Sequence, residues 1–248
     1  MIRIFKYQLN LIFLLLVIYL QSYSLLGQPG KSNTEDYVFH YMILPGFLNI
    51  WETKTSLSVL FTQLPFDWVD NAVEVPLFQI NNKLKLPYGF TLESRLQSVI
   101  ISNQLRAGPH WNYETGKFSF NAGVESEFML GKIKFAGFGF NNKSWGWCIY
   151  PNIMVGYRMK DTAIAINGEL NFINSLKITS GNKEILYSRN LFSGISVSLL
   201  AEQPLWKDRM MIIGFINSFQ KVYFPAWPAF STFNRKYYIP QFYVGLVL

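Results

Sequence analysis

The sequence predicts a closed antiparallel β-barrel that crosses a membrane, preceded by a secretory signal. Three observations carry this prediction: an apolar run near the start, strand-like alternation through most of the chain, and an amphipathic strand at the end. Half of the 248 residues are hydrophobic and 17% are aromatic. Yet no stretch after the first run reaches the roughly 18 consecutive apolar residues of a spanning helix. Apolar residues that alternate with polar ones are typical of a barrel, whose strands turn one face to lipid.

The first 27 residues have the organisation of a signal peptide. Arg3 and Lys6 precede an apolar run at 11–20, and small or weakly polar residues follow as far as Gly27. Because the run of about 10 residues is much shorter than the roughly 20 of a spanning helix, we expect cleavage near Gly27–Gln28 rather than a retained anchor. Cleavage would remove Arg3 and Lys6 and lower the formal charge from +7 to +5. We expect residues 28–36 to form a flexible segment and 37–248 to form the barrel.

The clearest strands alternate between apolar and polar side chains. In Lys117–Phe128, Phe118, Phe120 and Val124 share one face, and the opposite face is polar. Thr91–Ser98 and Thr162–Asn174 show the same period of two, which places alternate residues on opposite faces of a sheet. In a barrel surrounded by lipid, the apolar face is the outer one.

The remaining strands follow between turn signals. With those three, the tally is about 12, or 10 if Val38–Leu48 and one other segment are not strands, since single-chain bacterial barrels have even strand numbers. The others are Val38–Leu48, Thr53–Gln63, Val73–Lys85, Ile101–Trp111, Lys132–Phe140, Trp145–Met159, Leu191–Glu202, Arg209–Phe219 and Tyr237–Leu248.

A periplasmic C-terminus then assigns each connection to one side of the membrane. Such barrels have short periplasmic turns and longer outer loops. The turns are expected at Leu130–Gly131, Lys160–Asp161 and Gln203–Asp208. The loops are expected at Asn112–Gly116, Asn141–Ser144, Leu176–Arg189 and Lys221–Lys236. The connection at Gln63–Ala72 is long for the periplasmic side on which this count places it.

The last expected strand is similar to the C-terminal strands of known membrane barrels. In Tyr237–Leu248, the side chains of Phe242, Val244, Leu246 and Leu248 lie on one face. An exported chain that ends in such a strand resembles the small outer-membrane β-barrels of Gram-negative bacteria, although these often end in Phe. The abundance of Asn, Lys, Ile and Phe is similar to that of exported Bacteroidota proteins, and no characterised family is indicated.

The resemblance implies a location in the bacterial outer membrane. It also implies two partners: outer-membrane lipid, and the barrel-assembly machinery, which would recognise the C-terminal strand Tyr237–Leu248. The basic residues are dispersed and form no stripe interleaved with aromatic residues, so we expect no nucleic-acid partner.

Charged residues gather on the predicted lumen face. Opposite charges inside a narrow barrel should pair, because an unpaired charge out of water is costly. We expect an ion-paired lumen that closes the barrel, with a selectivity ring or a binding site as the alternative reading. The residues are Glu93, Arg95, Arg106, Glu125, Glu127 and Glu169, and Lys132 and Lys134 join them if their strand is oriented inward.

The sequence indicates no catalytic site, cofactor or metal. The chain has two separated histidines, His40 and His110, and a single cysteine, Cys148, which excludes an intramolecular disulfide. A lipid hydrolase needs a serine within hydrogen-bond reach of a histidine, but Ser102 lies at the opposite end of the strand that holds His110. We expect His110 to be a structural residue on the lumen side near the outer rim.

The segment Val222–Arg235 is unusually aromatic for a loop. We expect it to pack on the barrel rim; folding inward over the lumen, lying on lipid and contacting a ligand or partner are the alternatives. The residues concerned are Phe224, Trp227, Phe230 and Phe233.

Taken together, the sequence predicts a non-enzymatic outer-membrane barrel. It is either a narrow, porin-like channel or a structural or binding barrel with a charged lumen, and no solute is indicated. The alternatives are an outer-membrane lipid-modifying hydrolase and a secreted, soluble, lipocalin-like binder.

Overall fold

The predicted closed antiparallel β-barrel is confirmed, with ten strands, the lower of the two expected counts. The computed structural model describes residues 40–65, 74–99, 101–135, 140–206, 209–226 and 235–248. The expected signal peptide and the segment 28–36 lie outside these ranges. Within them, no helix is long and apolar enough to cross a bilayer.

Each strand pairs with its neighbours in the chain, and β1 pairs with β10 to close the ring. The strands are β1 (Thr53–Gln63), β2 (Glu74–Lys85), β3 (Phe90–Ser98), β4 (Ser102–Thr115), β5 (Phe118–Phe135), β6 (Phe140–Arg158), β7 (Ala163–Ser180), β8 (Lys183–Trp206), β9 (Arg209–Gln220) and β10 (Tyr237–Val247). Three short 3₁₀ turns accompany them: η1 (Pro45–Phe47), η2 (Pro87–Gly89) and η3 (Phe224–Ala226).

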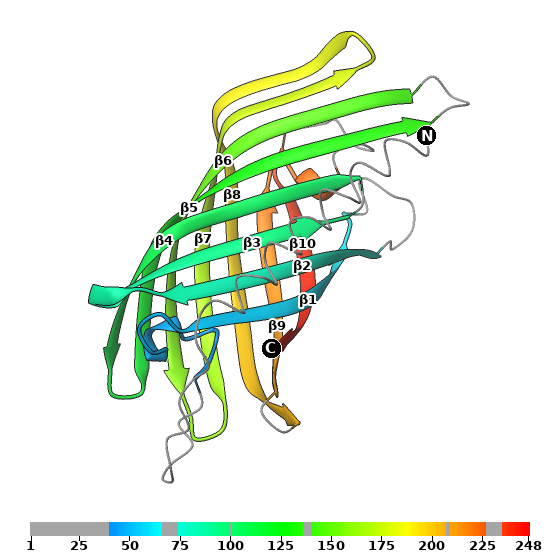
Figure 1. Ribbon diagram of the computed structural model, residues 1–248. Coiled ribbons are helices and arrows are strands. Elements are labelled where there is room, and N and C mark those ends of the chain that lie inside the picture. Colours follow the sequence, from blue (N-terminus) through cyan, green and yellow to red (C-terminus); the bar gives the residue numbers. More distant parts are fainter. Residues whose placement is uncertain (1–39, 66–73, 100, 136–139, 207–208, 227–234) are drawn as a thin grey trace. The chain divides into compact units, whose positions relative to one another are not determined.

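The strands differ in length, so the wall of the barrel is taller on one side than on the other. We call the rim where β1 begins and β10 ends the terminal rim, and the other end the opposite rim. The strands β5 to β8 have 18 to 24 residues and rise beyond the shorter strands β1 to β4 at the opposite rim (Figure 1). These four strands are longer than the roughly 9–11 residues that a tilted strand needs to cross a bilayer.

Two predicted strands are wrong. The described part of Val38–Leu48 forms turns and η1, because Pro45 and Gly46 begin a 3₁₀ turn and no strand pairs with the segment. Lys132–Phe140 is no separate strand: residues 132–135 continue β5, and Phe140 begins β6. The ladder therefore runs through Leu130–Gly131, which was expected to be a turn.

Because Lys132–Phe140 is not a separate strand, every connection that precedes it lies at the opposite end of the barrel from the one predicted. The turn that follows β4 now lies at the terminal rim rather than outside. The long connection between β1 and β2 now lies at the opposite rim, so its length is no longer anomalous.

Two expected outer loops are also wrong, because polar residues continue the ladder instead of ending it. Asn141–Ser144 belongs to β6. In place of the loop Leu176–Arg189, β7 and β8 continue to a tight turn at Gly181, whose φ of 58° favours glycine. Lys177 Nζ lies 2.9 Å from Glu184 Oε2 across this hairpin.

The predicted alternation of side chains is confirmed in β3, β5 and β7. Phe118, Phe120, Val124 and Phe128 of β5 are exposed on the outside, whereas Glu125 and Glu127 are buried inside. Large apolar side chains are exposed in the same way on the other strands, including Leu57, Phe61, Phe78, Leu92, Leu105, Ile153, Val155, Ile166, Leu170, Val197, Leu199 and Phe215.

A segment that precedes β1 fills the lumen at the terminal rim. We call residues Tyr41–Leu48 the plug, which belongs to the blue segment that precedes β1 (Figure 1). The side chains of Tyr41 and Leu44 are fully buried. The plug packs against inward-facing apolar residues such as Met210 and Ile212 of β9. This contact explains why β9 is apolar on both faces: one face is the outer surface of the barrel and the other meets the plug.

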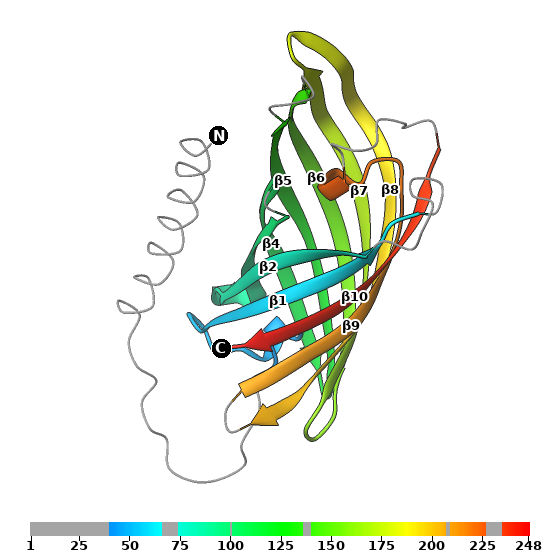
Figure 2. The ribbon, with the colours of Figure 1, turned by 90° about the vertical axis from the view of Figure 1, so that its right-hand side faces the viewer.

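The segment that directly follows β9, residues 221–226, reaches into the lumen at the opposite rim. Val222 and Phe224 are buried against Met129, Cys148 and Ile173, and η3 lies beside the inner face of the barrel (Figure 2). This part of the aromatic segment therefore folds inward rather than packing on the rim. The other three residues of that prediction, Trp227, Phe230 and Phe233, lie outside the described residues.

Candidate functional site

A polar cavity of about 190 Å³ lies in the lumen between the plug and η3. A single water needs roughly 10–15 Å³ on the same measure, so the cavity is large enough for a small molecule. Its floor includes Met42 and Ile43 of the plug, and Tyr223 and Phe224 contribute to its other end.

All six predicted charged residues line this cavity. Glu93 and Arg95 come from β3, Arg106 from β4, Glu125 and Glu127 from β5, and Glu169 from β7. The period of two turns each of them inward, and the curvature of the barrel wall brings inward side chains of β4 and β7 together, although β5 and β6 lie between these strands. Lys132 and Lys134 are not among the lining residues, because they lie at outward positions of β5.

Arg106 is the centre of the charged network. Its guanidinium pairs with both Glu125 and Glu169 and is only 4% exposed. Its Nε donates a hydrogen bond to Glu125 Oε2 at 2.5 Å, and its Cζ lies 3.9 Å from the centroid of the Tyr150 ring. The Tyr150 hydroxyl donates to Glu127 Oε1 at 3.0 Å, so a second buried carboxylate joins the same group.

Glu93 lies on the side of the cavity toward β2. Lys83 Nζ is 2.8 Å from Glu93 Oε2. Arg95 lines the cavity as well, and its buried Nε has no hydrogen-bond partner among the described residues.

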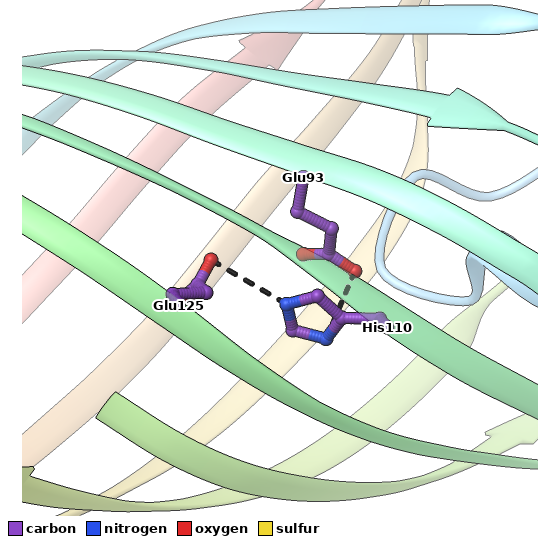
Figure 3. Close-up of side chains that lie close together, drawn as sticks. All are labelled: Glu93, His110 and Glu125. Atoms are coloured by element: carbon purple, nitrogen blue, oxygen red, sulfur yellow. Dashed lines mark ion pairs between the residues drawn. The ribbon is translucent and has the colours of Figure 1, made fainter. Parts of the chain in front are cut away.

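His110 stands between Glu93 and Glu125 (Figure 3). Its Nδ1 lies 2.8 Å from Asn121 Oδ1 and 3.7 Å from Glu93 Oε1, and its Nε2 lies 3.5 Å from Glu125 Oε1. The expected lumen position is correct, but β4 now runs toward the terminal rim, so His110 does not lie near the outer rim.

The partners of His110 are carboxylates and an amide rather than a serine. Ser102, the serine considered for a hydrolase, is eight positions away on the same strand. At about 3.4 Å per residue, this separation is roughly 27 Å. A hydrolytic pair of these two residues is therefore excluded.

Glu202, a buried carboxylate outside the Arg106 network, holds the plug. Glu202 of β8 is fully buried, and its two oxygens accept hydrogen bonds from the backbone N–H groups of Met42, at 3.0 Å, and Ile43, at 2.8 Å. Lys85 Nζ donates to Gly46 O at 3.1 Å from the other side of the lumen.

Outside the strands, Glu52 ties the end of the plug to β1. Its Oε2 accepts from the Asn49 backbone N–H at 2.8 Å and lies 2.7 Å from His40 Nδ1. Burial alone would raise the pKa of Glu52, but the hydrogen bonds from His40 and Asn49, with the positive charge of Lys54, hold it below its usual value.

Sequence reasoning missed Lys83, Tyr150, Glu202 and the contact of His110 with both glutamates. Lys83 had a visible signal, since it shares a strand face with Gln79 and Asn81. Glu202 had none: its partners are backbone groups 159 and 160 residues earlier, in a segment expected to be a strand.

No protein-family model and no curated protein matches the chain. Among solved structures, Neisserial surface protein A is similar with a TM-score of 0.38 and 8% identity, over 79% of this chain and 96% of that chain. The KdgM porin in complex with disordered oligogalacturonate is similar with a TM-score of 0.38 and 11% identity, over 78% and 97%. The translocator domain of the autotransporter NalP from Neisseria meningitidis gives a TM-score of 0.37 and 9% identity, over 79% and 87%.

Proposed function

We propose that this chain is a bacterial outer-membrane β-barrel whose lumen is closed by its own plug and encloses a binding cavity for a small polar solute. The observation that carries the proposal is the plug itself, which lies inside the barrel with its backbone bonded to a buried glutamate.

The outer surface supports a position in a membrane. Along the strands, the outward side chains are large and apolar, and the inward ones are mostly polar. A lipocalin-type soluble barrel would reverse this pattern, because its exterior faces water. Exposed aromatic residues also gather toward both ends of the strands, as in the girdles of membrane barrels: Trp51, Tyr88, Trp111 and Trp206 toward the terminal rim, and Trp145, Trp147 and Tyr238 toward the opposite rim.

The packing of the plug supports a closed lumen. Side chains fill the interior of an eight-stranded barrel, so ten strands leave a space slightly wider than that. Here the plug occupies this space at the terminal rim, and the Arg106 network bridges the lumen farther along. The two obstructions lie in series along the path that a solute would follow.

The lining of the cavity supports a polar ligand. Three lining residues carry a buried polar atom without a hydrogen-bond partner among the described residues: Arg95 Nε, His110 Nε2 and Asn171 Oδ1. Buried polar atoms normally have partners, so these donors and acceptors are suited to a bound molecule that offers both.

Single-channel recording in planar bilayers tests this proposal. We expect the folded wild-type barrel to insert without steady conductance. Glu202→Ala removes the acceptor of the Met42 and Ile43 N–H groups, and we expect it to produce intermittent openings. Glu184→Ala, in the exposed hairpin of β7 and β8, is the matched control and should stay silent. A long-lived ohmic conductance of the wild type would overturn the closed lumen and favour the narrow channel.

A further inference from the structure

Three potential metal ligands from three strands meet in the cavity wall. Glu93, His110 and Glu125 each offer one ligand atom, and these atoms all lie within 4.8 Å of one another (Figure 3). They come from β3, β4 and β5, which are neighbours in the sheet but separate in sequence. The cluster combines one imidazole with two carboxylates, a donor set suited to first-row divalent metals such as Zn²⁺.

A chain of amides fixes the tautomer of His110. Asn112 Nδ2 donates to Thr91 Oγ1 at 2.7 Å and to Gly89 O, which leaves Asn112 Oδ1 to accept from Asn121 Nδ2 at 2.8 Å. Asn121 Oδ1 is then the acceptor that faces His110, so Nδ1 carries the proton. The lone pair of the neutral ring is therefore on Nε2.

That Nε2 atom is buried and has no hydrogen-bond donor beside it. The His110 side chain is 4% exposed, and Nε2 has no hydrogen-bond partner among the described residues. Its neighbour at 3.5 Å is Glu125 Oε1, which is itself an acceptor. Two acceptors held face to face away from water need a positive charge between them, which either a proton on Nε2 or a bound metal cation supplies.

Each carboxylate has one oxygen bound to a cationic side chain and one near His110. Lys83 binds Oε2 of Glu93, and Arg106 binds Oε2 of Glu125. Glu125 Oε1 lies 3.5 Å from His110 Nε2, whereas Glu93 Oε1 lies 3.7 Å from Nδ1 and accepts from Asn121 Nδ2 at 3.4 Å. The outer oxygens thus hold the carboxylates in place, as outer-shell partners do in metal sites.

The charge of the cavity also favours a bound cation. Among the described residues that line it, four are carboxylates (Glu93, Glu125, Glu127 and Glu169), and three are permanently positive (Lys83, Arg95 and Arg106). The net charge of these lining side chains is therefore −1 when His110 is neutral.

We propose that Glu93, His110 and Glu125 form a binding site for a divalent first-row metal ion, with His110 Nε2 as the nitrogen ligand. In a tetrahedral zinc site with bonds near 2.0–2.1 Å, neighbouring ligand atoms are about 3.4 Å apart. The 3.5 Å between Nε2 and Glu125 Oε1 matches this edge. The ligand atoms of the cluster lie within 4.8 Å of one another, so side-chain movements must shorten the wider separations when the metal binds. Three protein ligands leave a fourth position toward the cavity, and the site stands whether or not the lumen conducts.

Zinc binding to the folded barrel tests the proposal. A chain without a histidine tag is folded in detergent, treated with chelator, and titrated with Zn²⁺ by calorimetry, with Co²⁺ absorption as a second readout of tetrahedral geometry. We expect one Zn²⁺ per chain.

Three substitutions define the site. His110→Ala should weaken Zn²⁺ binding by more than about 100-fold, because loss of a ligand exceeds the roughly 10–100-fold cost of losing an outer-shell partner. Asn121→Ala, which removes the acceptor of the Nδ1 proton, should fall within that 10–100-fold range. His40→Ala removes the other histidine and should bind as the wild type does. If His110→Ala does not fold, as judged by heat-modifiable gel mobility, Glu93→Gln replaces it with the same expectation.

Two results would overturn the metal site. The folded wild type could bind no Zn²⁺ in stoichiometric amount, which would reduce the cluster to an ion pair between protonated His110 and Glu125. Alternatively, binding could survive His110→Ala and Glu93→Gln and disappear in His40→Ala, which would locate the metal at the terminal rim.

Discussion

At the residue scale, the alternation of apolar and polar residues predicts which side chains point into the lumen and which point outward. The period of two in β5 placed Glu125 and Glu127 inward and Phe118 and Phe128 outward, as the structure has them. It did not tell which inward charges meet. Arg106 pairs with Glu169, 63 residues later, because the curvature of the barrel wall brings inward side chains of β4 and β7 together. The barrel's circumference, which depends on strand number, determines such a contact.

The Arg106 network should dominate the stability of the lumen. Arg106→Met leaves two buried carboxylates without their cation, and breaking a buried pair in this way costs about 3–5 kcal/mol. Unfolding by urea in lipid vesicles, followed by tryptophan fluorescence, measures this loss. Lys177→Met breaks the exposed pair with Glu184 and should cost less than about 1 kcal/mol. Equal costs for the two variants would contradict the central role of Arg106.

The Glu52 carboxylate should make the terminal rim sensitive to acid. Because its pKa in the folded chain lies below the usual value of 4.5, its contribution to stability is present above pH 4.5 and is lost as the pH falls below it. Glu52→Gln should therefore lower the melting temperature at neutral pH and converge with the wild type at low pH. Glu74→Gln, at an exposed position of β2, is the control. A constant difference between wild type and Glu52→Gln at every pH would show that Glu52 acts without its charge.

At the element scale, the sequence predicted six of the ten strands to within four residues at each end and placed one end of each of β5, β6, β7 and β8 five to eight residues too early or too late. Lys132–Phe140 resembled a strand because it contains the top of β5 and the start of β6, joined by four residues outside the described ranges. The plug was mistaken for a strand for a related reason: Tyr41–Leu44 is apolar enough to be buried, and sequence alone does not distinguish burial in a lumen from burial in a sheet.

The position of the plug inside the barrel can be tested by substituting two glycines in the strands. A side chain at Gly156 of β6 would collide with the Leu44 side chain of the plug, whereas one at Gly168 of β7 meets only Ile153 Cγ1 at 4.0 Å. Overpacking of this kind costs about 1–3 kcal/mol. We expect Gly156→Val to lower the unfolding free energy by that amount and to raise channel openings, with Gly168→Val close to wild type. Identical behaviour of the two variants would contradict the position of Leu44.

At the scale of the whole molecule, an apolar exterior surrounds a polar interior, the reverse of a soluble protein. Ten strands provide the circumference, the plug and η3 lie inside it toward the two rims, and the ion-paired wall surrounds a polar cavity between them. Composition and alternation were sufficient to predict the inverted exterior. The plug was not predictable, since its partner Glu202 lies 159 and 160 residues later in the chain. The metal-ligating cluster lies on three consecutive strands, and its contacts depend on their register, which alternation alone does not give.

The measurement that tests this account most directly is the heat-modifiable gel mobility of the protein extracted with detergent from outer membranes. A folded membrane barrel keeps its closed strand ladder in detergent until it is boiled. We predict that the unboiled protein migrates as a distinct band and shifts on boiling. Recovery of the protein in the soluble fraction without detergent, with no shift, would contradict the membrane barrel and with it the closed lumen that we propose.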